Sequence, residues 1–278
     1  MLNRDRTAAF PSYQAVTLGL LQGPTELLPV SSSAHTALLP WLAGWPYDEL
    51  DPELRKSFQV ALHAGAALAL ALDMRTELLG EARTLDSRRA AVIACSLAPP
   101  ALAGLLFQRF IERRLGGPRS IAAGLIAGAV AMALADARPA AEPRPLADAG
   151  PRDGLALGLA QTFALVPGVS RNGAALTAAR ARGFARRDAQ ALSWHAALPV
   201  ILGASALKGL RLVRSGAPDG ARQTLAAGAG SAFISTLACA PLLRRAPRGR
   251  SLLPFSVYRL ILAAVVLRRL RSADNGEG

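Results

Sequence analysis

Long uncharged stretches, separated by clusters of arginine, constrain this chain more than any other feature of its sequence. The stretch from Ala90 to Gln108 contains no charged residue, and Arg88, Arg89 and Arg109 flank it. A helix of roughly 20 apolar residues is long enough to cross the hydrocarbon core of a membrane. We therefore interpret this stretch as a transmembrane helix.

Five further apolar runs bring the prediction to six transmembrane helices. The run at Phe58–Leu72 is short for a span and depends on its polar flanks, and the run at Ser251–Leu267 is interrupted only by Arg259. Amphipathic stripes at helical spacing are missing from the runs, which argues against a water-soluble helical bundle. The five runs are Phe58–Leu72, Ser120–Ala135, Ala189–Leu207, Gln223–Leu243 and Ser251–Leu267.

The composition is typical of helices that pack closely in lipid. The chain of 278 residues is 51% apolar and only 5% aromatic, with a net charge of +13. Small residues let helices approach one another in lipid, and arginines in the loops can contact anionic headgroups. We therefore expect membrane lipids as partners and no nucleic acid. Neither a cleavable signal peptide after Arg4 and Arg6 nor a disulfide is expected.

A proline-rich linker at residues 137–149 divides the chain into halves of about 1–136 and 150–278. Aligning Leu18–Ser33 with Leu157–Asn172 at a constant offset gives identical residues at six of sixteen positions. Three predicted spans separate the two copies, so the second enters the membrane from the opposite face. We predict one all-α membrane domain, built as an inverted repeat.

Each copy of the repeat is interrupted by residues that break helices. Pro29 interrupts the first copy and Pro167–Gly168 the second, because proline lacks a backbone donor and blocks helix continuation. Ser31, Ser32 and Ser170 are placed to cap the helix that follows each break. We predict two re-entrant helical hairpins, whose inner helix N-termini attract an anion.

The first polar segment carries a carboxylate at membrane depth. Gln22 and Glu26 are four residues apart and share one helical face if the helix continues through Pro24. A charge at this depth costs on the order of 3 kcal/mol, so Glu26 should face a cavity, pair with a cation or be protonated. The structural alternative is a carboxylate at the water interface.

Hydroxyl groups and an imidazole follow the first break. Ser31, Ser32 and His35 can supply a cap, a nucleophile and an acid or base within a few residues. Serines after proline are more often caps, and a lone histidine is more often structural. The presence of Glu26 favours the catalytic interpretation.

The second polar segment centres on Arg171, whose guanidinium needs an anionic partner in an apolar setting. Phosphate suits its planar fork, and Gly168 and Gly173 allow close approach of the backbone. An internal salt bridge between Arg171 and Glu26 is the structural alternative.

Together these groups are suited to phosphoryl transfer. The carboxylate of Glu26 with adjacent hydroxyls could also hold Mg²⁺ or Ca²⁺. The candidate catalytic residues are Glu26, Ser32, His35 and Arg171, and the candidate phosphate-binding residues are Gln22, Thr25, Ser31, Gly168, Ser170 and Asn172.

Both segments resemble motifs of the undecaprenyl-diphosphate phosphatase family of the bacitracin-resistance type. Residues 22–35, QGPTELLPVSSSAH, are similar to that family's Glu/Gln-x-x-x-Glu segment running into Pro-x-Ser-Ser-x-Gly-His. Residues 167–173, PGVSRNG, are similar to its Pro-Gly-x-Ser-Arg-Ser-x-x-Thr segment, and weaker similarity continues at residues 58–65, 198–204 and 255–259.

The resemblance implies cleavage of the terminal phosphate from undecaprenyl diphosphate in recycling of the cell-wall lipid carrier. It implies a site on the outer face of the bacterial cytoplasmic membrane, dependence on a divalent cation, and six spans with two re-entrant hairpins.

Four positions depart from the family's commoner pattern. Gln22 stands where Glu is usual, Ala34 replaces Gly, Asn172 replaces Ser and Ala175 occupies the position of Thr. A neutral amide cannot supply a second negative charge, so we expect metal affinity and pH dependence to differ.

In the expected mechanism, Glu26 activates Ser32 or a water for attack on the terminal phosphorus, while Arg171 stabilises the developing charge. His35 protonates the leaving lipid phosphate or assists the base. The polar residues Ser170 and Asn172 hold phosphate oxygens.

Two other function classes stay open at this point. Inverted repeats around a charged site are typical of secondary transporters and lipid flippases, which would not hydrolyse the lipid. An intramembrane serine hydrolase using Ser32 and His35 would leave Arg171 without a task. A homodimer is one option for the oligomeric state.

Overall fold

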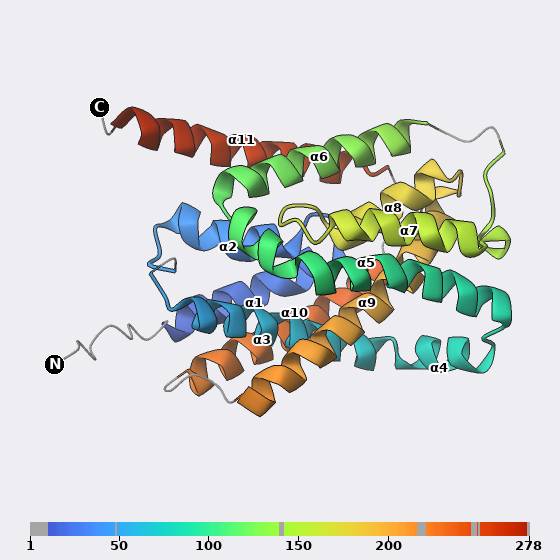
Figure 1. Cartoon of the computed structure of the whole chain (residues 1–278), viewed down its shortest axis with the longest axis horizontal. Helices are drawn as coiled ribbons and strands as arrows, with labels where there is room; N and C mark the ends of the chain where they lie inside the picture. Colours follow the sequence, from blue (N-terminus) through green and yellow to red (C-terminus); the bar gives the residue numbers. More distant parts are fainter. Residues whose placement is uncertain are drawn as a thin grey trace. The chain divides into compact units, whose positions relative to one another are not determined.

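The computed structural model describes residues 11–47, 49–138, 142–215, 221–245, 249 and 251–276. In this part of the chain, α-helices follow one another and the only β-type pairing is an isolated bridge between Arg144 and Phe184 (Figure 1). The predicted all-α class is confirmed. The helices are α1 (Ser12–Leu27), α2 (Ser32–Ala43), α3 (Pro52–Asp73), α4 (Arg75–Arg83), α5 (Ser87–Arg114), α6 (Pro118–Ala137), α7 (Pro151–Phe163), α8 (Arg171–Ala181), α9 (Arg186–Ser215), α10 (Arg222–Arg245) and α11 (Leu253–Gly276), with a 3₁₀ turn at Leu146–Asp148.

Four of the described helices are long and apolar enough to cross a membrane. They coincide with four of the six predicted spans. The other two predicted spans lie in α3 and α11, helices of 22 and 24 residues that do not reach the same combination of length and hydropathy. The four candidate spans are Ser87–Phe107, Pro118–Ala137, Arg186–Arg214 and Arg222–Leu243.

Both predicted helix breaks are present, between α1 and α2 and between α7 and α8. Ser31 has a φ of +76° and Gly168 a φ of +98°, the left-handed conformation that ends a helix. A Cβ on Gly168 would lie 2.3 Å from the carbonyl oxygen of Ile121 on α6. Glycine is therefore required here both by conformation and by the close approach of two backbones.

Serine hydroxyls cap the helix that follows each break. The Oγ of Ser170 accepts a hydrogen bond from the backbone N–H of Gly173 at 3.1 Å. The Oγ of Ser31 accepts one from the backbone N–H of Ala34 at 3.4 Å. The predicted capping roles of Ser31 and Ser170 are confirmed, whereas Ser32 is the first residue of α2.

The chain forms two compact units, each assembled from segments on both sides of the predicted linker. Because of this exchange, the units do not coincide with the halves 1–136 and 150–278, which stay a prediction. Unit 1 comprises Met1–Leu27, His35–Leu79 and Ile201–Leu243, and unit 2 comprises Leu28–Ala34, Gly80–Val200 and Arg244–Gly278.

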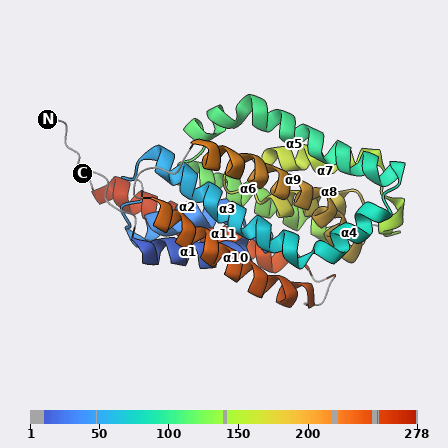
Figure 2. The ribbon, with the colours of Figure 1, turned by 90° about the horizontal axis from the view of Figure 1, so that it is seen from below.

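In unit 1, glycines allow α1, α3 and α10 to pack side by side (Figure 2). A Cβ on Gly19 of α1 would lie 2.6 Å from the carbonyl oxygen of Gly228 on α10. A Cβ on Gly65 of α3 would lie 2.2 Å from the carbonyl oxygen of Ala229. Close contact through small residues is the expected packing mode for helices in lipid.

In two of the helices that continue through proline, a neighbouring helix bonds the carbonyl that the proline leaves free. Pro24 cannot donate to the carbonyl four residues before it, and the hydroxyl of Ser235 on α10 donates to that oxygen at 2.6 Å. In unit 2, Gln161 of α7 donates to the carbonyl four residues before Pro100 at 3.4 Å. Consequently α1 runs on to Leu27, as required for Gln22 and Glu26 to share a face.

In unit 2, α5 packs along α7, α11 packs along α6, and α8 contacts both α6 and α7 (Figure 1). The pair α6 and α11 is antiparallel. Asp136 near the end of α6 accepts a hydrogen bond from the backbone of Leu252, just before α11, while Arg119 at the start of α6 pairs with Asp274 near the end of α11. Buried side chains of unit 2 include Met132, Leu157, Leu176, Phe184 and Leu192.

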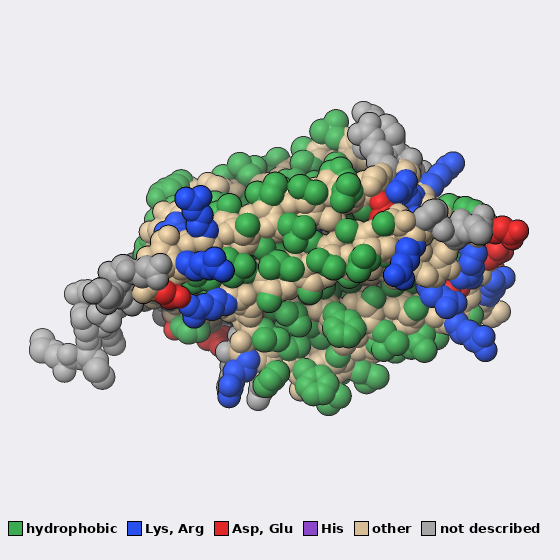
Figure 3. Space-filling model, turned by 90° about the horizontal axis from the view of Figure 1, so that it is seen from above, with side chains coloured by type: hydrophobic (Ala, Val, Ile, Leu, Met, Phe, Trp, Pro, Cys, Tyr) green, Lys and Arg blue, Asp and Glu red, His purple; other side chains and the backbone are tan. Residues whose placement is uncertain are grey.

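Large apolar side chains lie on the exposed surfaces of α5, α6 and α11. On the face shown in Figure 3, apolar side chains cover the middle, and Lys and Arg side chains gather toward the ends. This pattern is typical of helices that contact lipid, with basic residues at the depth of the headgroups. Examples of such exposed residues are Leu102, Leu105, Phe107, Leu134 and Ile261.

Part of the predicted linker is fixed to the start of α7. Arg144 donates to both carboxylate oxygens of Asp153 at 2.9 Å, and its guanidinium lies 4.4 Å from the ring centre of Phe184. The end of the linker is therefore held by an ion pair and a cation–π contact. Residues 139–141 of the linker, like Arg4 and Arg6, lie outside the described residues.

The close backbone contacts of α1 and α7 generate a stability prediction. A Cβ on Gly19 would lie 2.6 Å from a backbone oxygen of α10, and a Cβ on Gly158 would lie 2.6 Å from the carbonyl oxygen of Cys95 on α5. We predict that Gly19→Ala and Gly158→Ala each destabilise the protein by about 1–3 kcal/mol, the usual cost of overpacking. Thermal unfolding in detergent measures this as a lower midpoint.

The matched control is Gly104→Ala on α5, where a Cβ would meet nothing within 4 Å. Alanine there should leave stability unchanged or raise it by up to about 1 kcal/mol, because it restricts the unfolded chain. Equal midpoints for all three variants would contradict the packing described for α1 and α7.

Candidate active site

A carboxylate, an amide and an imidazole meet in unit 1. Gln22 and Glu26 lie on one face of α1, and the Nε2 of Gln22 donates to Glu26 Oε2 at 3.0 Å. The Nδ1 of His63, on α3, lies 3.0 Å from Gln22 Nε2 and 3.5 Å from Glu26 Oε2. Glu26 and Gln22 are buried, whereas the side chain of His63 is 34% exposed.

The amide of Gln22 orients this cluster. With its N–H groups directed at Glu26 and His63, the Nδ1 of a neutral His63 acts as acceptor and its proton sits on Nε2. The amide oxygen of Gln22 is buried and has no hydrogen-bond partner among the described residues. It is therefore an acceptor that the described residues leave unused.

His63 is not among the site residues predicted from the sequence. The available signal was an imidazole within the apolar run at residues 58–72, beside a segment that resembles the family. Nothing local in the sequence indicates its pairing with Gln22, which is 41 positions away.

Two further candidate residues of the first segment also belong to unit 1. The hydroxyl of Thr25 donates to the carbonyl of Leu21 at 2.7 Å, so its hydrogen is used within α1. His35 lies buried in the first turn of α2. The predicted roles of both residues stay predictions.

The serines of the first break lie in unit 2. Ser31 is buried, and its hydroxyl hydrogen-bonds that of Ser33 at 3.2 Å. A non-glycine residue in the left-handed region costs of order 1–3 kcal/mol, and such residues cluster at functional sites. Ser32, the candidate nucleophile, is half-buried at the start of α2.

The second break places Arg171 as the first residue of α8. Within unit 2, no hydrogen bond or ion pair of the described residues involves its half-buried guanidinium. Ser170 and Asn172 on either side are buried; Ser170 caps α8, and the Oδ1 of Asn172 accepts from Ser193 Oγ at 3.1 Å. The N-terminus of α8 thus combines a cation with the positive end of a helix dipole.

A second arginine, Arg259 of α11, is buried beside both breaks. Its side chain is 1% exposed, and its guanidinium donates to the carbonyls of Gly168 at 3.0 Å, Gly124 at 3.4 Å and Pro29 at 3.5 Å. A Cβ on Gly128 of α6 would lie 2.0 Å from Arg259 Nη2, so glycine leaves the room for this group. Arg259 therefore holds carbonyls of both breaks within unit 2.

Arg259 is not among the predicted site residues, and in the sequence it only interrupts an apolar run. Its charge within a predicted span was a signal, because charged residues inside a membrane are costly and usually functional. Its partners lie 91 to 230 positions away and are backbone oxygens, which no residue pattern identifies.

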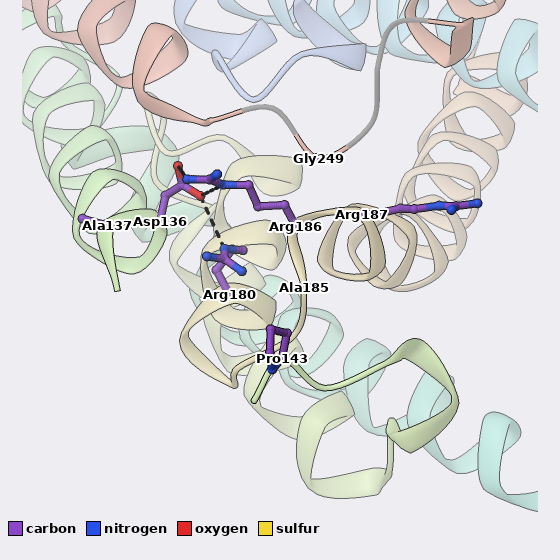
Figure 4. A pocket seen from close by; sticks show the side chains of 8 residues that line it. All are labelled: Asp136, Ala137, Pro143, Arg180, Ala185, Arg186, Arg187 and Gly249. Carbon is purple, nitrogen blue, oxygen red and sulfur yellow. Dashed lines mark hydrogen bonds and ion pairs between the residues drawn. The ribbon is translucent and has the colours of Figure 1, made fainter. Parts of the chain in front are cut away.

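A cavity in another part of unit 2 contains ion pairs that hold helices together. About 630 Å³ in volume, it is lined by Asp136, Arg180 and Arg186, and Arg187 points away from the others (Figure 4). Asp136 accepts from Arg186 at 2.7 and 3.0 Å, and Arg180 lies 3.4 Å from it. This carboxylate is thus neutralised by its neighbours and fixes the end of α6 to α8 and α9.

Each unit brings some of the predicted residues together. Unit 1 joins Gln22 and Glu26 to His63. Unit 2 holds the serines of the first break, the N-terminus of α8 and Arg259. Joint action of Glu26 with Arg171, which belong to different units, stays a prediction.

Comparison with known proteins gives the same assignment over almost the whole chain. The family model described as bacitracin resistance protein BacA matches residues 15–265. A protein of Geobacter sulfurreducens named undecaprenyl-diphosphatase is 39% identical over 268 residues, covering 92% of this chain and 97% of the relative.

Two other relatives carry the same name. That of Geobacter metallireducens is 38% identical over 265 residues, covering 91% of this chain and 96% of the relative. That of Thermomicrobium roseum is 38% identical over 276 residues, with 92% and 96% covered. The chain therefore belongs to the bacitracin resistance protein BacA family of bacterial membrane proteins.

Proposed function

We propose that this protein hydrolyses undecaprenyl diphosphate to undecaprenyl phosphate and inorganic phosphate, in the recycling of the lipid carrier for cell-wall synthesis. Its relatives over nearly the full length are named for this reaction. The observation that carries the proposal is the N-terminus of α8, where Arg171 has no partner within the described part of unit 2 and follows directly on a helix break. Hydrolysis of a diphosphate needs a site that binds its negative charge. The alternative of a lipid flippase or transporter has no support in the relatives' names.

The phosphate-binding role falls to the N-terminus of α8. Ser170 occupies the backbone N–H groups of Gly173 and Ala174, the third and fourth residues of the helix. The first N–H groups of a helix have no acceptor within it and, with the guanidinium of Arg171, suit a doubly charged phosphate. As phosphorus is attacked, these donors stabilise the charge that develops on its oxygens.

The reactive groups come from the first segment. Glu26 takes a proton from the attacking oxygen, which belongs to Ser32 or to a water, and this oxygen forms a bond to the terminal phosphorus. The bridging P–O bond breaks, and His35 protonates the departing lipid phosphate. If Ser32 attacks, water then hydrolyses the phosphoserine. The burial of Glu26 and its hydrogen bond from Gln22 support its assignment as base.

The proposal extends to the architecture in the membrane: six spans and two re-entrant hairpins in an inverted repeat, with the site on the outer face of the bacterial cytoplasmic membrane. An exchange of helices supports the repeat. Helix α10 from the second half packs on α1 through Gly19, and α5 from the first half packs on α7 through the equivalent Gly158. Whether two copies of the chain associate stays a prediction.

The residues around Glu26 do not by themselves fit a metal. No group of three or more His, Cys, Asp or Glu side chains able to hold a metal occurs among the described residues. Gln22 turns its N–H, not its oxygen, toward Glu26. No step is therefore assigned to a cation, and dependence on Mg²⁺ or Ca²⁺ remains a proposal in which substrate oxygens supply most of the ligands.

The function is tested by phosphate release from undecaprenyl diphosphate by the purified protein in detergent. We predict release by the wild type and a loss of at least about 100-fold in Glu26→Gln and Arg171→Ala, the usual effect of removing a general base or a charge-stabilising donor. Glu77→Gln and Arg187→Ala, at exposed positions of α4 and α9, serve as matched controls.

A wild type that releases no phosphate would overturn the proposed reaction. Unchanged rates in both Glu26→Gln and Arg171→Ala would overturn the assignment of the site. An excess of chelator tests the cation separately, because a rate that it does not alter removes the divalent cation from the proposal.

The departure at Gln22 gives a further prediction. Gln22→Glu adds a second carboxylate beside Glu26, so the concentration of Mg²⁺ or Ca²⁺ for half-maximal phosphate release should fall by about tenfold, because affinity rises with the charge of the ligands. Gln59→Glu, at an exposed position of α3, is the control. An unchanged cation requirement in Gln22→Glu would show that Glu26 and residue 22 do not bind the cation.

A further inference from the structure

A cleft of about 250 Å³ in unit 2 is lined by residues of α6, α7 and α8. Its walls are almost wholly apolar and made of small side chains, among them Ala131 of α6, Ala160 of α7 and Ala174 of α8. Ala131 is exposed, and Phe163 at the end of α7 is 70% exposed, so the cleft opens at the surface of this unit. An opening between membrane helices admits hydrocarbon more readily than water.

Arg259, which is almost fully buried, is the one charged residue among those that line the cleft. The Nη atoms of Arg259 bond the carbonyls of Gly168, Gly124 and Pro29, but its buried Nε has no hydrogen-bond partner among the described residues. An unmet donor on a buried cation is costly in apolar surroundings. Because Arg259 is almost fully buried and the other lining residues are nearly all apolar, the cleft suits a short hydrocarbon segment.

Two residues that line the cleft flank the proposed phosphate site in the chain. Val169 and Ala174 line it, and the residues between them in the chain include Ser170 and Arg171. A phosphate held at the N-terminus of α8 therefore brings the first carbons attached to it to the cleft. The volume is smaller than that of a typical ligand pocket, roughly 300–1,000 Å³, so it takes a short segment of a chain rather than a whole lipid.

We propose that this cleft binds the isoprene units nearest the diphosphate of the polyprenyl substrate, with the phosphates at the N-terminus of α8 and the remaining chain in the lipid. The proposal rests on the proposed function and adds a binding site for the hydrocarbon part of the substrate. It assigns to Ala131, Ala160 and Ala174 the role of keeping the cleft open, since larger side chains would fill it.

A photoactivatable prenyl monophosphate with a diazirine in its first isoprene unit tests the proposal directly. Irradiation with the wild-type protein in detergent should label peptides from α6, α7 or α8 that line the cleft. Undecaprenyl phosphate should displace the label, and phosphatidylglycerol at the same concentration should not. Labelling elsewhere, or equal displacement by phosphatidylglycerol, would overturn the proposal, the latter outcome identifying a groove for bulk lipid.

Filling the cleft provides the second arm. Ala131→Phe should reduce the labelling and raise the KM for undecaprenyl diphosphate by about tenfold with little change in kcat, the lower end of what one ill-fitting group in an apolar pocket costs. Ala98→Phe, the same change at an exposed position of α5, is the matched control. Ala127→Leu, on the same wall of the cleft, replaces Ala131→Phe if thermal unfolding shows that variant to be unfolded.

The outcomes separate this proposal from the proposed function. Specific labelling with no phosphate release by the wild type would leave the cleft standing and overturn the hydrolysis. Phosphate release with equal KM for wild type, Ala131→Phe and Ala127→Leu would overturn the cleft and leave the hydrolysis standing.

Discussion

Backbone polar groups that a helix break leaves without partners must find them inside the protein, because hydrocarbon offers none. In unit 2 one side chain bonds backbone carbonyls of both breaks. The buried guanidinium of Arg259 donates to carbonyls of both breaks, at Pro29 and Gly168, and to Gly124 of α6. The positions of Ser31 and of the N-terminus of α8, and hence the proposed phosphate chemistry, depend on this contact.

Where α1 and α5 continue through proline, a neighbouring helix meets the same requirement. Ser235 bonds the carbonyl freed by Pro24, and Gln161 bonds the one freed by Pro100. These donors reach the backbone because glycines, such as Gly19 and Gly158, let the helix axes approach. Small residues, internal donors and broken helices are thus parts of a single arrangement, which explains why a chain rich in Ala and Gly can carry polar segments at membrane depth.

Features determined by neighbouring residues were predictable from the sequence. The all-helical class, the four helices that are candidate spans, both helix breaks and the caps at Ser31 and Ser170 follow from apolar runs and from the chemistry of proline and serine. The shared face of Gln22 and Glu26 follows from helical spacing. In each case the physical cause acts within a few residues.

Contacts between distant segments could not be predicted in this way. His63 joins Gln22 across 41 positions, and Arg259 reaches backbone oxygens that any residue type carries. The division into two units that exchange segments is likewise invisible to local patterns, since it depends on which helices pack together. The weakest span, at residues 58–72, fails a simple hydropathy criterion because α3 carries polar groups such as His63 that the interior of unit 1 uses.

The contact of Arg259 with the carbonyls of both breaks is tested most directly by hydrogen–deuterium exchange of the wild type and of Arg259→Met. Methionine has no hydrogen-bond donor but keeps much of the length of the side chain. We predict that segments 28–34 and 167–173 both exchange faster in the variant, by about tenfold or more, since unmet buried carbonyls cost roughly 1–3 kcal/mol each. Protection of α5 and α7, whose contact does not involve Arg259, should be unchanged. Equal protection of both breaks in wild type and variant would contradict the account.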